Sequence, residues 1–172
     1  GISFISSLDP DSNAARQLDS GTNPEDVDNY LLDVDKPLVL PVGKKVKFLI
    51  TADDVIHAWW VPDLGWKKDA IPGFINETWT MADEEGVYRG QCAELCGKDH
   101  AFMPIAVRVV SADQFSKWAA AAVDDVDAAN KLLARLIDED KTLEAEAYLR
   151  MADSSIAAPL RAGERVTVTG AP

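Results

Sequence analysis

Four side chains able to bind a soft metal lie within one short stretch of the chain. Cys92, Cys96, His100 and Met103 fall in the run Gly-Gln-Cys-Ala-Glu-Leu-Cys-Gly-Lys-Asp-His-Ala-Phe-Met-Pro, and the whole chain has only two cysteines and two histidines. Two thiolates, an imidazole and a thioether form a donor set that copper accepts well. A zinc site has little use for the methionine. This run therefore predicts copper chemistry.

The second histidine, His57, lies upstream in the apolar segment Val55–Val61, which is predicted to form a strand. A lone histidine in such surroundings is usually a packed core residue, but the donor loop downstream favours its use as a ligand. A histidine on a strand, joined by a loop with Cys, His and Met, resembles a cupredoxin. In that arrangement a β-sandwich holds copper at one end.

Two cysteines four residues apart leave several kinds of chemistry open. They could form a disulfide, a redox dithiol or a pair of metal ligands. An ordinary blue-copper site uses one cysteine, whereas two thiolates pointing into one cavity could bridge two copper ions. Each copper would then be completed by one histidine, with a methionine and a backbone carbonyl as weak ligands. Such a centre would transfer single electrons, because sharing the charge between two metals reduces the rearrangement at each.

Short β-branched and apolar runs separated by turn signals predict a mainly β fold, an antiparallel sandwich or barrel. In one of them Val46, Phe48 and Ile50 alternate with Lys47 and Leu49, as in a half-buried strand. A loop is predicted over residues 63–73, which contain two glycines and a proline. The predicted strands are 30–34, 38–42, 46–51, 55–61, 74–81, 86–91 and 104–110.

The two ends of the chain differ from this β region. Residues 1–29 are predicted to form an irregular arm with a short helix near Asn13–Leu18, and residues 30–118 to form the copper-binding domain. Residues 119–172 are predicted to form an acidic helical extension and tail. The predicted helices are one that begins at the capping residue Ser111 and two more at 124–137 and 142–151, joined by a turn at 138–141; Arg165–Thr169 is a strand-like run in the tail.

The net charge of −12, from 29 acidic and 17 basic residues, argues against binding to nucleic acid or to an anionic membrane. An acidic surface can steer a basic protein partner instead. No apolar stretch is long enough to span a membrane, and the first residues lack the features of a signal peptide. Because the chain begins with glycine, we expect it to have been processed, split or truncated.

The run Gly90–Pro104 strongly resembles the binuclear copper loop, the CuA loop, of cytochrome c oxidase subunit II. Segments 32–41, 54–59 and 68–73 are also similar to that family and occur in the family's order, so that the resemblance covers roughly residues 28–118. It implies a cupredoxin-like Greek-key β-sandwich or barrel. The C-terminal helical extension lies outside the family pattern, and without a Cys-x-x-Cys-His motif it cannot attach a haem.

The resemblance also implies a role for each candidate residue. Cys92 and Cys96 would bridge the two copper ions, and His57 and His100 would each terminate one. Met103 would be a weak ligand. The ligand set is completed by the main-chain carbonyl of Glu94, whose side chain in the family also reaches a magnesium ion at the interface with subunit I. Acidic residues near the copper end are expected to dock cytochrome c: Asp35, Asp54 and Asp69.

The implied function is that of an electron-transfer domain, and so of an enzyme only as a subunit of cytochrome c oxidase. It would take single electrons from cytochrome c and pass them to haem in subunit I, among other membrane subunits, for oxygen reduction. The expected location is the periplasmic face of the bacterial inner membrane, or the mitochondrial intermembrane space. Family members normally begin with two transmembrane helices and an aromatic-rich stretch, which we expect to lie upstream or on a separate polypeptide.

Three other functions fit part of this pattern. The CuA domain of nitrous-oxide reductase uses the same kind of centre, although the residues around Cys96 and Met103 resemble the oxidase more closely. A structural zinc module would use His57, Cys92, Cys96 and His100 but would leave the methionine without a role. A copper chaperone or storage protein would have a more exposed site than a histidine on a core strand suggests.

Overall fold

The computed structural model describes residues 1–156, and the side chains of residues 1–150. The predicted run Arg165–Thr169 lies outside the described residues. The chain divides into two compact units, Gly1–Leu133 and Ala134–Pro172, and every strand of the described region lies in the first unit. The candidate metal ligands all belong to this first unit.

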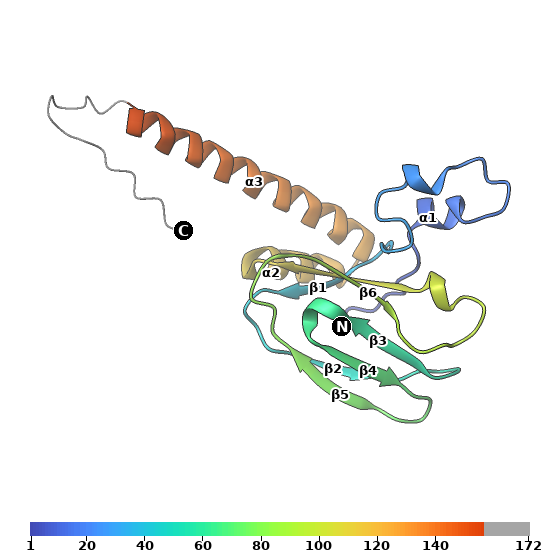
Figure 1. Ribbon diagram of the computed structural model, residues 1–172. Coiled ribbons are helices and arrows are strands. Elements are labelled where there is room, and N and C mark those ends of the chain that lie inside the picture. Colours follow the sequence, from blue (N-terminus) through green and yellow to red (C-terminus); the bar gives the residue numbers. More distant parts are fainter. Residues whose placement is uncertain (157–172) are drawn as a thin grey trace, which may run out of the picture. The chain divides into compact units, whose positions relative to one another are not determined.

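The first unit contains two β-sheets (Figure 1). The larger sheet has the strand order β1-β7-β6-β3-β4, and the smaller sheet pairs β2 with β5. All pairs are antiparallel except β1 and β7, which run parallel. The expected mainly β fold with C-terminal helices is confirmed. The strands are β1 Leu38–Pro41, β2 Val46–Ile50, β3 His57–Val61, β4 Trp66–Ala70, β5 Asn76–Thr80, β6 Gly86–Cys92 and β7 Pro104–Val110.

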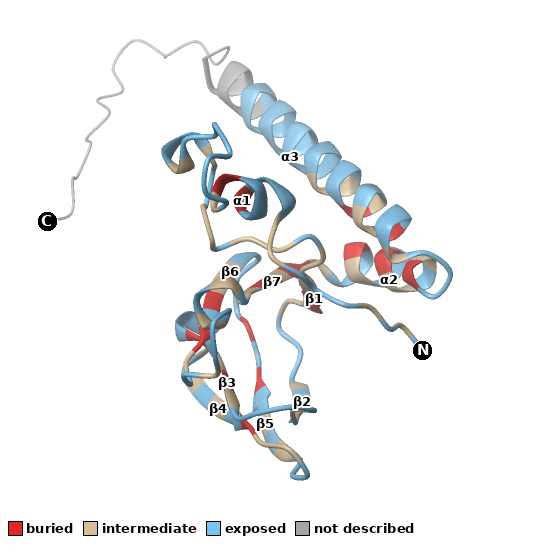
Figure 2. Ribbon diagram, turned by 90° about the vertical axis from the view of Figure 1, so that its right-hand side faces the viewer, coloured by how far each residue is buried: buried red, intermediate tan, exposed pale blue. Residues whose placement is uncertain are grey.

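The core lies on the faces of the strands where apolar residues recur at every second position. In β2 the predicted alternation is confirmed, with Val46, Phe48 and Ile50 partly buried and the residues between them exposed. The ring of Phe48 lies 5.3 Å from that of Trp59, which in turn stacks on Trp66 at 4.9 Å. Figure 2 shows the buried positions along β1 and β7. The buried cluster consists of Leu40, Val61, Ala82, Val107 and Val109.

The strand predicted at 30–34 does not form. Asn29 and Leu31 adopt left-handed backbone conformations, with φ values of 51° and 60°, and turn the chain instead of extending it. The buried hydroxyl of Ser12 accepts a hydrogen bond of 3.2 Å from the Leu31 N–H and holds this turn. Only the single bridge between Leu8 and Val34 remains of β pairing there.

The loop predicted at 63–73 contains a strand. Pro62–Leu64 form a tight turn that ends at Gly65 with φ 78°, after which β4 pairs with β3. The sequence did not predict β4, because two lysines and an aspartate make it polar. A polar exposed side is tolerated here because β4 is an edge strand of the sheet. The alternation of burial along Trp66–Ala70 is nevertheless that of a strand.

The helices also differ in extent from the prediction. The first helix, α1 (Pro10–Ala15), begins earlier than predicted, because Asp9 caps it and Pro10 occupies its first position. The helix α2 (Ala112–Ala122) begins after the predicted capping residue Ser111, which forms a capping box with Gln114. The helices predicted at 124–137 and 142–151 form one continuous helix, α3 (Val126–Ile156). Residues 138–141 contain neither glycine nor proline, so nothing in them breaks the helix.

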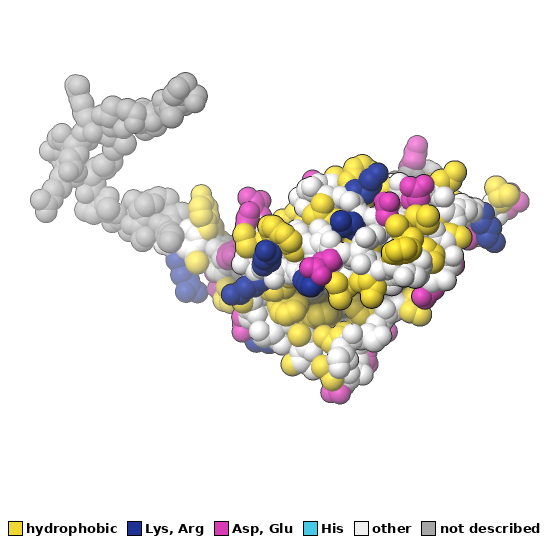
Figure 3. All heavy atoms as spheres, turned by 90° about the horizontal axis from the view of Figure 1, so that it is seen from below, with side chains coloured by type: hydrophobic (Ala, Val, Ile, Leu, Met, Phe, Trp, Pro, Cys, Tyr) yellow, Lys and Arg dark blue, Asp and Glu magenta, His cyan; other side chains and the backbone are white. Residues whose placement is uncertain are grey.

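The two-stranded sheet carries exposed apolar side chains. Leu49 and Trp79 on β2 and β5 are 63% and 54% exposed, and hydrophobic side chains gather on the face seen in Figure 3. Lys45 lies over the Trp79 ring at 4.0 Å, and Lys47 pairs with Glu77 at 2.6 Å. None of the described helices combines the length and the apolar character that crossing a membrane requires.

Candidate metal centre

Strand pairing brings the first histidine to the first cysteine. His57 begins β3 and Cys92 ends β6, and these strands are neighbours in which Trp59 lies opposite Cys92. The contact continues past the end of β6, because the Ala93 N–H donates to the carbonyl of Ala58 at 3.0 Å. The apolar residues that follow His57 pack β3 into the sheet. His57 is the first residue of this strand, so its ring lies at the strand's end.

Gly90 allows β6 and β3 to approach each other closely. A Cβ atom at this position would collide with the main-chain oxygen of Trp60 and lie 2.7 Å from the Cα of Val61. Only glycine fits without a shift of backbone, since none of these atoms belongs to a flexible side chain. The glycine at the start of the metal-binding run thus has a packing role, two residues before Cys92.

The loop after β6 returns the remaining donors to the same place. Gly97 adopts φ 135°, a conformation that other residues rarely adopt, and the loop then enters a single 3-10 turn at His100–Phe102. The N–H of His100 donates to Gly97 at 3.2 Å, and that of Phe102 donates to Asp99 at 2.9 Å. This turn presents His100 from its first position and Met103 immediately after its last.

Three donor side chains and one carbonyl meet around the two cysteine sulfurs. The Cys92 and Cys96 Sγ atoms lie 3.8 Å apart. The Nδ1 atom of His57 lies 3.9 Å from Cys92 Sγ, and that of His100 lies 3.5 Å from Cys96 Sγ. The ligand atoms of His57, Cys92 and Cys96 all lie within 4.8 Å of one another. The two remaining contacts are Cys96 Sγ to Met103 Sδ at 3.5 Å and Cys92 Sγ to the Glu94 carbonyl at 3.3 Å.

This arrangement fits shared metal ligands and not a disulfide. Both cysteines are free, and a separation of 3.8 Å is well beyond an S–S bond of about 2.05 Å. A metal about 2.3 Å from each of two sulfurs 3.8 Å apart would subtend an angle of about 110°, close to tetrahedral. Each sulfur also has an imidazole nitrogen within 3.9 Å.

The environment of Cys92 favours its thiolate. Burial raises the pKa of the Cys92 thiol, but hydrogen bonds with the backbone at Ala58 and Glu94 lower it. The imidazoles of His57 and His100 act in the same direction, and the net result is a pKa of about 7. Since the thiolate is the form that binds metals, one ligand is partly ionised at neutral pH before any metal arrives.

Cys96 behaves in the opposite way. Burial raises the pKa of its thiol, and both the hydrogen bond with Cys92 and the negative charge on Cys92 raise it further. The two sulfurs are therefore not both ionised in the metal-free protein near neutral pH. Binding of a metal to both sulfurs would release the proton that Cys96 keeps.

His57 is oriented by an acid on its far side. Its Nε2 atom lies 2.8 Å from Asp54 Oδ1, while its Nδ1 atom faces Cys92. The hydrogen bond to Asp54 raises the pKa of His57, and it lowers the pKa of Asp54 in return. A carboxylate that binds the outer nitrogen of a histidine fixes the ring and makes the inner nitrogen a better ligand.

The other acidic candidates lie in different surroundings. Asp35 is engaged within the protein, because its carboxylate accepts hydrogen bonds from the Ser7 N–H at 2.7 Å and from Lys36 at 2.9 Å. Asp69 is exposed on β4 opposite Ala58. The Glu94 side chain is exposed on the loop between the two cysteines.

An apolar cavity of about 670 Å³ opens next to the donor cluster. Its lining includes His57, Cys92 and Met103, together with Ser7 and Leu8 of the arm formed by residues 1–35. The cluster is thus accessible from this side.

Two contacts between the arm and the metal-binding elements were not predicted from the sequence. The carboxylate of Asp33 binds Arg89 on β6 through two hydrogen bonds of 2.8 and 3.2 Å. The guanidinium of Arg16 lies over the ring of Phe102, 4.1 Å from its centroid. Each contact joins residues far apart in the sequence, and no local pattern marks either pair.

Comparisons with known proteins agree with this geometry. The family model described as cytochrome c oxidase subunit II, periplasmic domain, matches residues 14–110. Probable cytochrome c oxidase subunit 2 of Rickettsia prowazekii (strain Madrid E) is 60% identical over 90 residues, which are 52% of this chain and 29% of that protein. The corresponding protein of Rickettsia bellii (strain RML369-C) is 59% identical over 90 residues, 52% of this chain and 34% of the relative. The chain thus spans about a third of the length of these curated relatives.

A solved structure extends the similarity to the fold. The crystal structure of the periplasmic domain of subunit II of cytochrome oxidase (CoxB) of Bradyrhizobium japonicum matches with a TM-score of 0.60 and 43% sequence identity. The match covers 73% of this chain and 80% of that one. The chain therefore belongs to the family of the periplasmic domain of cytochrome c oxidase subunit II.

Proposed function

We propose that this chain holds a binuclear copper centre and transfers single electrons within a haem-copper oxidase. Cys92 and Cys96 are the bridging ligands, and His57 and His100 each terminate one metal. Met103 and the carbonyl of Glu94 are the weak ligands. The observation that supports this assignment is the pair of free sulfurs 3.8 Å apart, each with an imidazole nitrogen beside it at 3.9 or 3.5 Å.

The copper pair, when bound, supplies a redox couple that accepts and releases one electron at a time. The protein supplies a rigid ligand frame. Strand pairing fixes His57 against Cys92, and the turn at His100–Phe102 fixes the remaining donors. Asp54 holds the His57 ring in one orientation. A frame that does not rearrange with the charge of the metals keeps electron transfer fast.

The partners follow from the relatives and from charge. As a subunit of cytochrome c oxidase, the chain receives electrons from a basic cytochrome c and passes them to haem in subunit I. The net charge of −12 favours encounter with a basic protein. Asp54 and Asp69 are exposed acids near the copper end that would take part in docking, with Asp35 as a third candidate. The side chain of Glu94 would contribute to a magnesium site completed by subunit I.

Copper explains more of the donor set than zinc does. A zinc module would need only the two thiolates and the two imidazoles. The Met103 sulfur, 3.5 Å from Cys96 Sγ, is the additional soft donor that favours copper. The family match to cytochrome c oxidase likewise favours the oxidase over nitrous-oxide reductase.

The direct test is to add copper to the purified metal-free chain. We expect two copper ions per chain and a purple mixed-valence centre whose unpaired electron is shared equally by two copper nuclei. The variant Cys96→Ser should lose the two-metal spectrum altogether, because one remaining thiolate cannot bridge two metals.

A matched variant separates ligand loss from general damage. Met103→Leu should keep both coppers and the shared electron but shift the reduction potential, since weak axial donors tune it. A colourless product with one metal per chain, or a two-metal spectrum that survives in Cys96→Ser, would contradict the proposal.

A further inference from the structure

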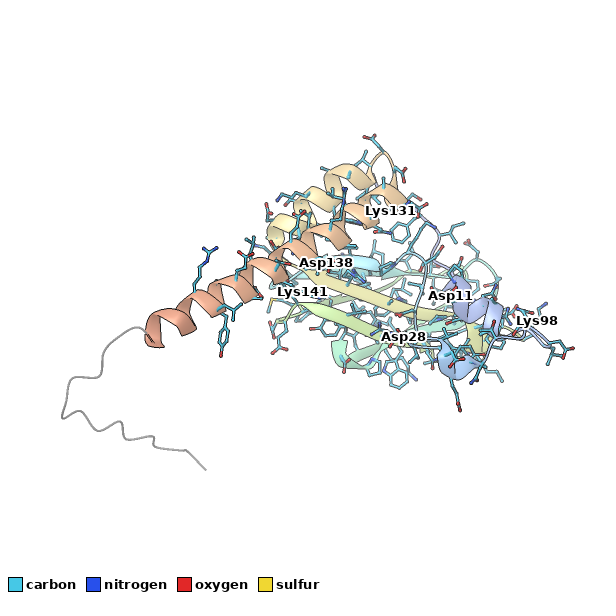
Figure 4. All side chains as sticks on the ribbon, turned by 90° about the horizontal axis from the view of Figure 1, so that it is seen from above. Asp11, Asp28, Lys98, Lys131, Asp138 and Lys141 are labelled. Carbon is cyan, nitrogen blue, oxygen red and sulfur yellow. The ribbon has the colours of Figure 1, made fainter. Side chains whose placement is uncertain are left out.

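The N-terminal arm, residues 1–35, is held against the metal-binding elements at two points. Asp33 forms its paired hydrogen bonds with Arg89, three residues before Cys92 on β6. Arg16 lies over Phe102, which precedes Met103. Figures 1 and 4 both show α1 at the same end of the domain as the loop that carries Lys98.

Arg16 is itself positioned by the fold of the arm. It follows directly after α1, and its Nε donates a hydrogen bond of 2.8 Å to the side chain of Asn13. Ser12, fully buried in α1, anchors this helix to the turn at Leu31. The guanidinium is therefore presented to the Phe102 ring by a folded element, and the contact is not that of a long side chain moving freely over the surface.

Phe102 occupies a position from which it can influence two ligands. It is the last residue of the turn that begins at His100, and Met103 follows it. The half-buried ring of Phe102 lies under the guanidinium of Arg16. A cation placed over an aromatic face is attracted by the ring's negative charge density, more strongly than an uncharged side chain would be.

The geometry points to Arg16 as a positioning residue for the metal centre. It seats Phe102 and so holds the turn that presents His100 and Met103. Its fixed positive charge next to this turn also disfavours the more positive oxidised state of the metals, and so raises the reduction potential. This role rests on the proposed copper function, and it lies outside the ligand set itself.

The test uses the complete chain loaded with copper. Arg16→Gln should release copper to an excess of chelator roughly threefold to tenfold faster, the range that corresponds to an ordinary cation–π contact. Its reduction potential should fall. Arg16→Lys should stay close to the parent potential because the charge is kept. The matched control is Lys44→Gln, which removes the same charge from the exposed turn between β1 and β2 and should change neither value.

A double variant identifies the contact responsible. Phe102→Leu should release copper as fast as Arg16→Gln, and the double variant should be no faster than the faster single one, because both remove the same contact. Wild-type release and potential in Arg16→Gln would overturn the inference. Fully additive effects of the two substitutions would overturn it as well.

A measurement without metal keeps this inference separate from the function. In the metal-free chain, Arg16→Gln should speed hydrogen exchange of the His100 and Phe102 amides, which bond within the turn. Failure of the chain to bind two coppers would contradict the proposed function. The hydrogen-exchange rates would still show whether Arg16 holds the turn. Unchanged exchange at both amides would count against Arg16.

Discussion

Asp54 connects a metal ligand with the protein surface. Its carboxylate binds His57 at 2.8 Å, yet its side chain is 71% exposed, so it can also meet a partner. We expect Asp54→Asn to weaken copper binding by about tenfold in the isolated chain, since loss of such outer partners usually costs 10- to 100-fold. Competition with a chelator of known affinity measures this effect.

Asp69→Asn is the matched control for Asp54. Asp69 is an exposed acid on β4, and no contact with a candidate ligand is found for its carboxylate among the described side chains. The Asp69→Asn variant should keep the copper affinity of the parent and should only slow the reaction with a basic cytochrome c at low salt. Equal copper affinity in the Asp54 and Asp69 variants would remove Asp54 from the support of the site.

Asp35 predicts a pH dependence of stability. Partial burial opposes ionisation of Asp35, but the Ser7 N–H and the Lys36 ammonium outweigh it and hold the pKa of this carboxyl below its ordinary value. A depressed folded-state pKa adds stability above the unfolded value of about 4, and that stability is lost as the pH falls through the folded value.

Asp35→Asn should therefore lower the free energy of unfolding by about 1 kcal/mol at neutral pH. The deficit should shrink below pH of about 4, where the parent carboxyl also becomes neutral. Denaturant unfolding of both proteins over a pH series measures the difference. A deficit that stays constant down to the lowest pH would show that the charge of Asp35 is irrelevant.

The residues of the metal site differ in how far they could be predicted. Cys92, Cys96, His100 and Met103 lie close together in the sequence, and their chemical types alone indicate a shared metal. His57 needed a second argument, because only strand pairing brings it to the loop. The contacts of Arg16 and Arg89 could not be predicted, since arginine is common on surfaces and its partner in each case lies in a distant segment.

At the scale of secondary structure, the approach of β6 to β3 determines where Cys92 lies. Gly90→Ala would force the backbone of Trp60 and Val61 aside, because the added Cβ has no space. We expect a loss of roughly 2–3 kcal/mol in the free energy of unfolding, as for other overpacked sites. We also expect weaker copper binding, because the shift separates Cys92 from His57. Unfolding curves and copper titration test both effects.

Gly21→Ala is the control for this substitution. Gly21 has φ 73°, but no atom lies within 4 Å of an added Cβ. It should cost about 1 kcal/mol through backbone strain and leave copper binding intact. A Gly90→Ala protein with parent-like stability and copper affinity would contradict the packing role of Gly90.

Secondary structure was predicted correctly where the local sequence pattern was strong. It was missed where contacts between distant residues determine the conformation. The alternation in β2 and the capping residue Ser111 of α2 are local signals, and both were confirmed. β4 was missed because an edge strand needs few apolar residues. The turn at Leu31 depends on a hydrogen bond from its N–H to the Ser12 hydroxyl, which no run of neighbouring residues reveals.

At the scale of the whole molecule, the chain divides into two compact units. We expect the second unit to be dispensable for copper binding, because every candidate ligand lies in the first. Residues 138–150 of α3 are all exposed, whereas Leu133 is 1% exposed. A chain that ends after Ile137 should bind two coppers and change its free energy of unfolding by less than about 1 kcal/mol. Copper stoichiometry and denaturant unfolding check both points.

Leu133→Ala in the full chain provides the comparison. Removal of this buried side chain should cost about 3 kcal/mol, because it leaves a cavity. A shortened chain that loses copper or unfolds as readily as this variant would show that the second unit supports the first.

The placement of His57 on a different strand from the other ligands constrains the order of assembly. During synthesis, the ribosome delivers this residue first, and the sulfur-rich loop emerges only later. A metal ion that met the nascent polypeptide could find the loop donors but not the distant imidazole, which arrives only once β3 and β6 have paired. The complete set of side-chain donors therefore exists only once these two strands have paired.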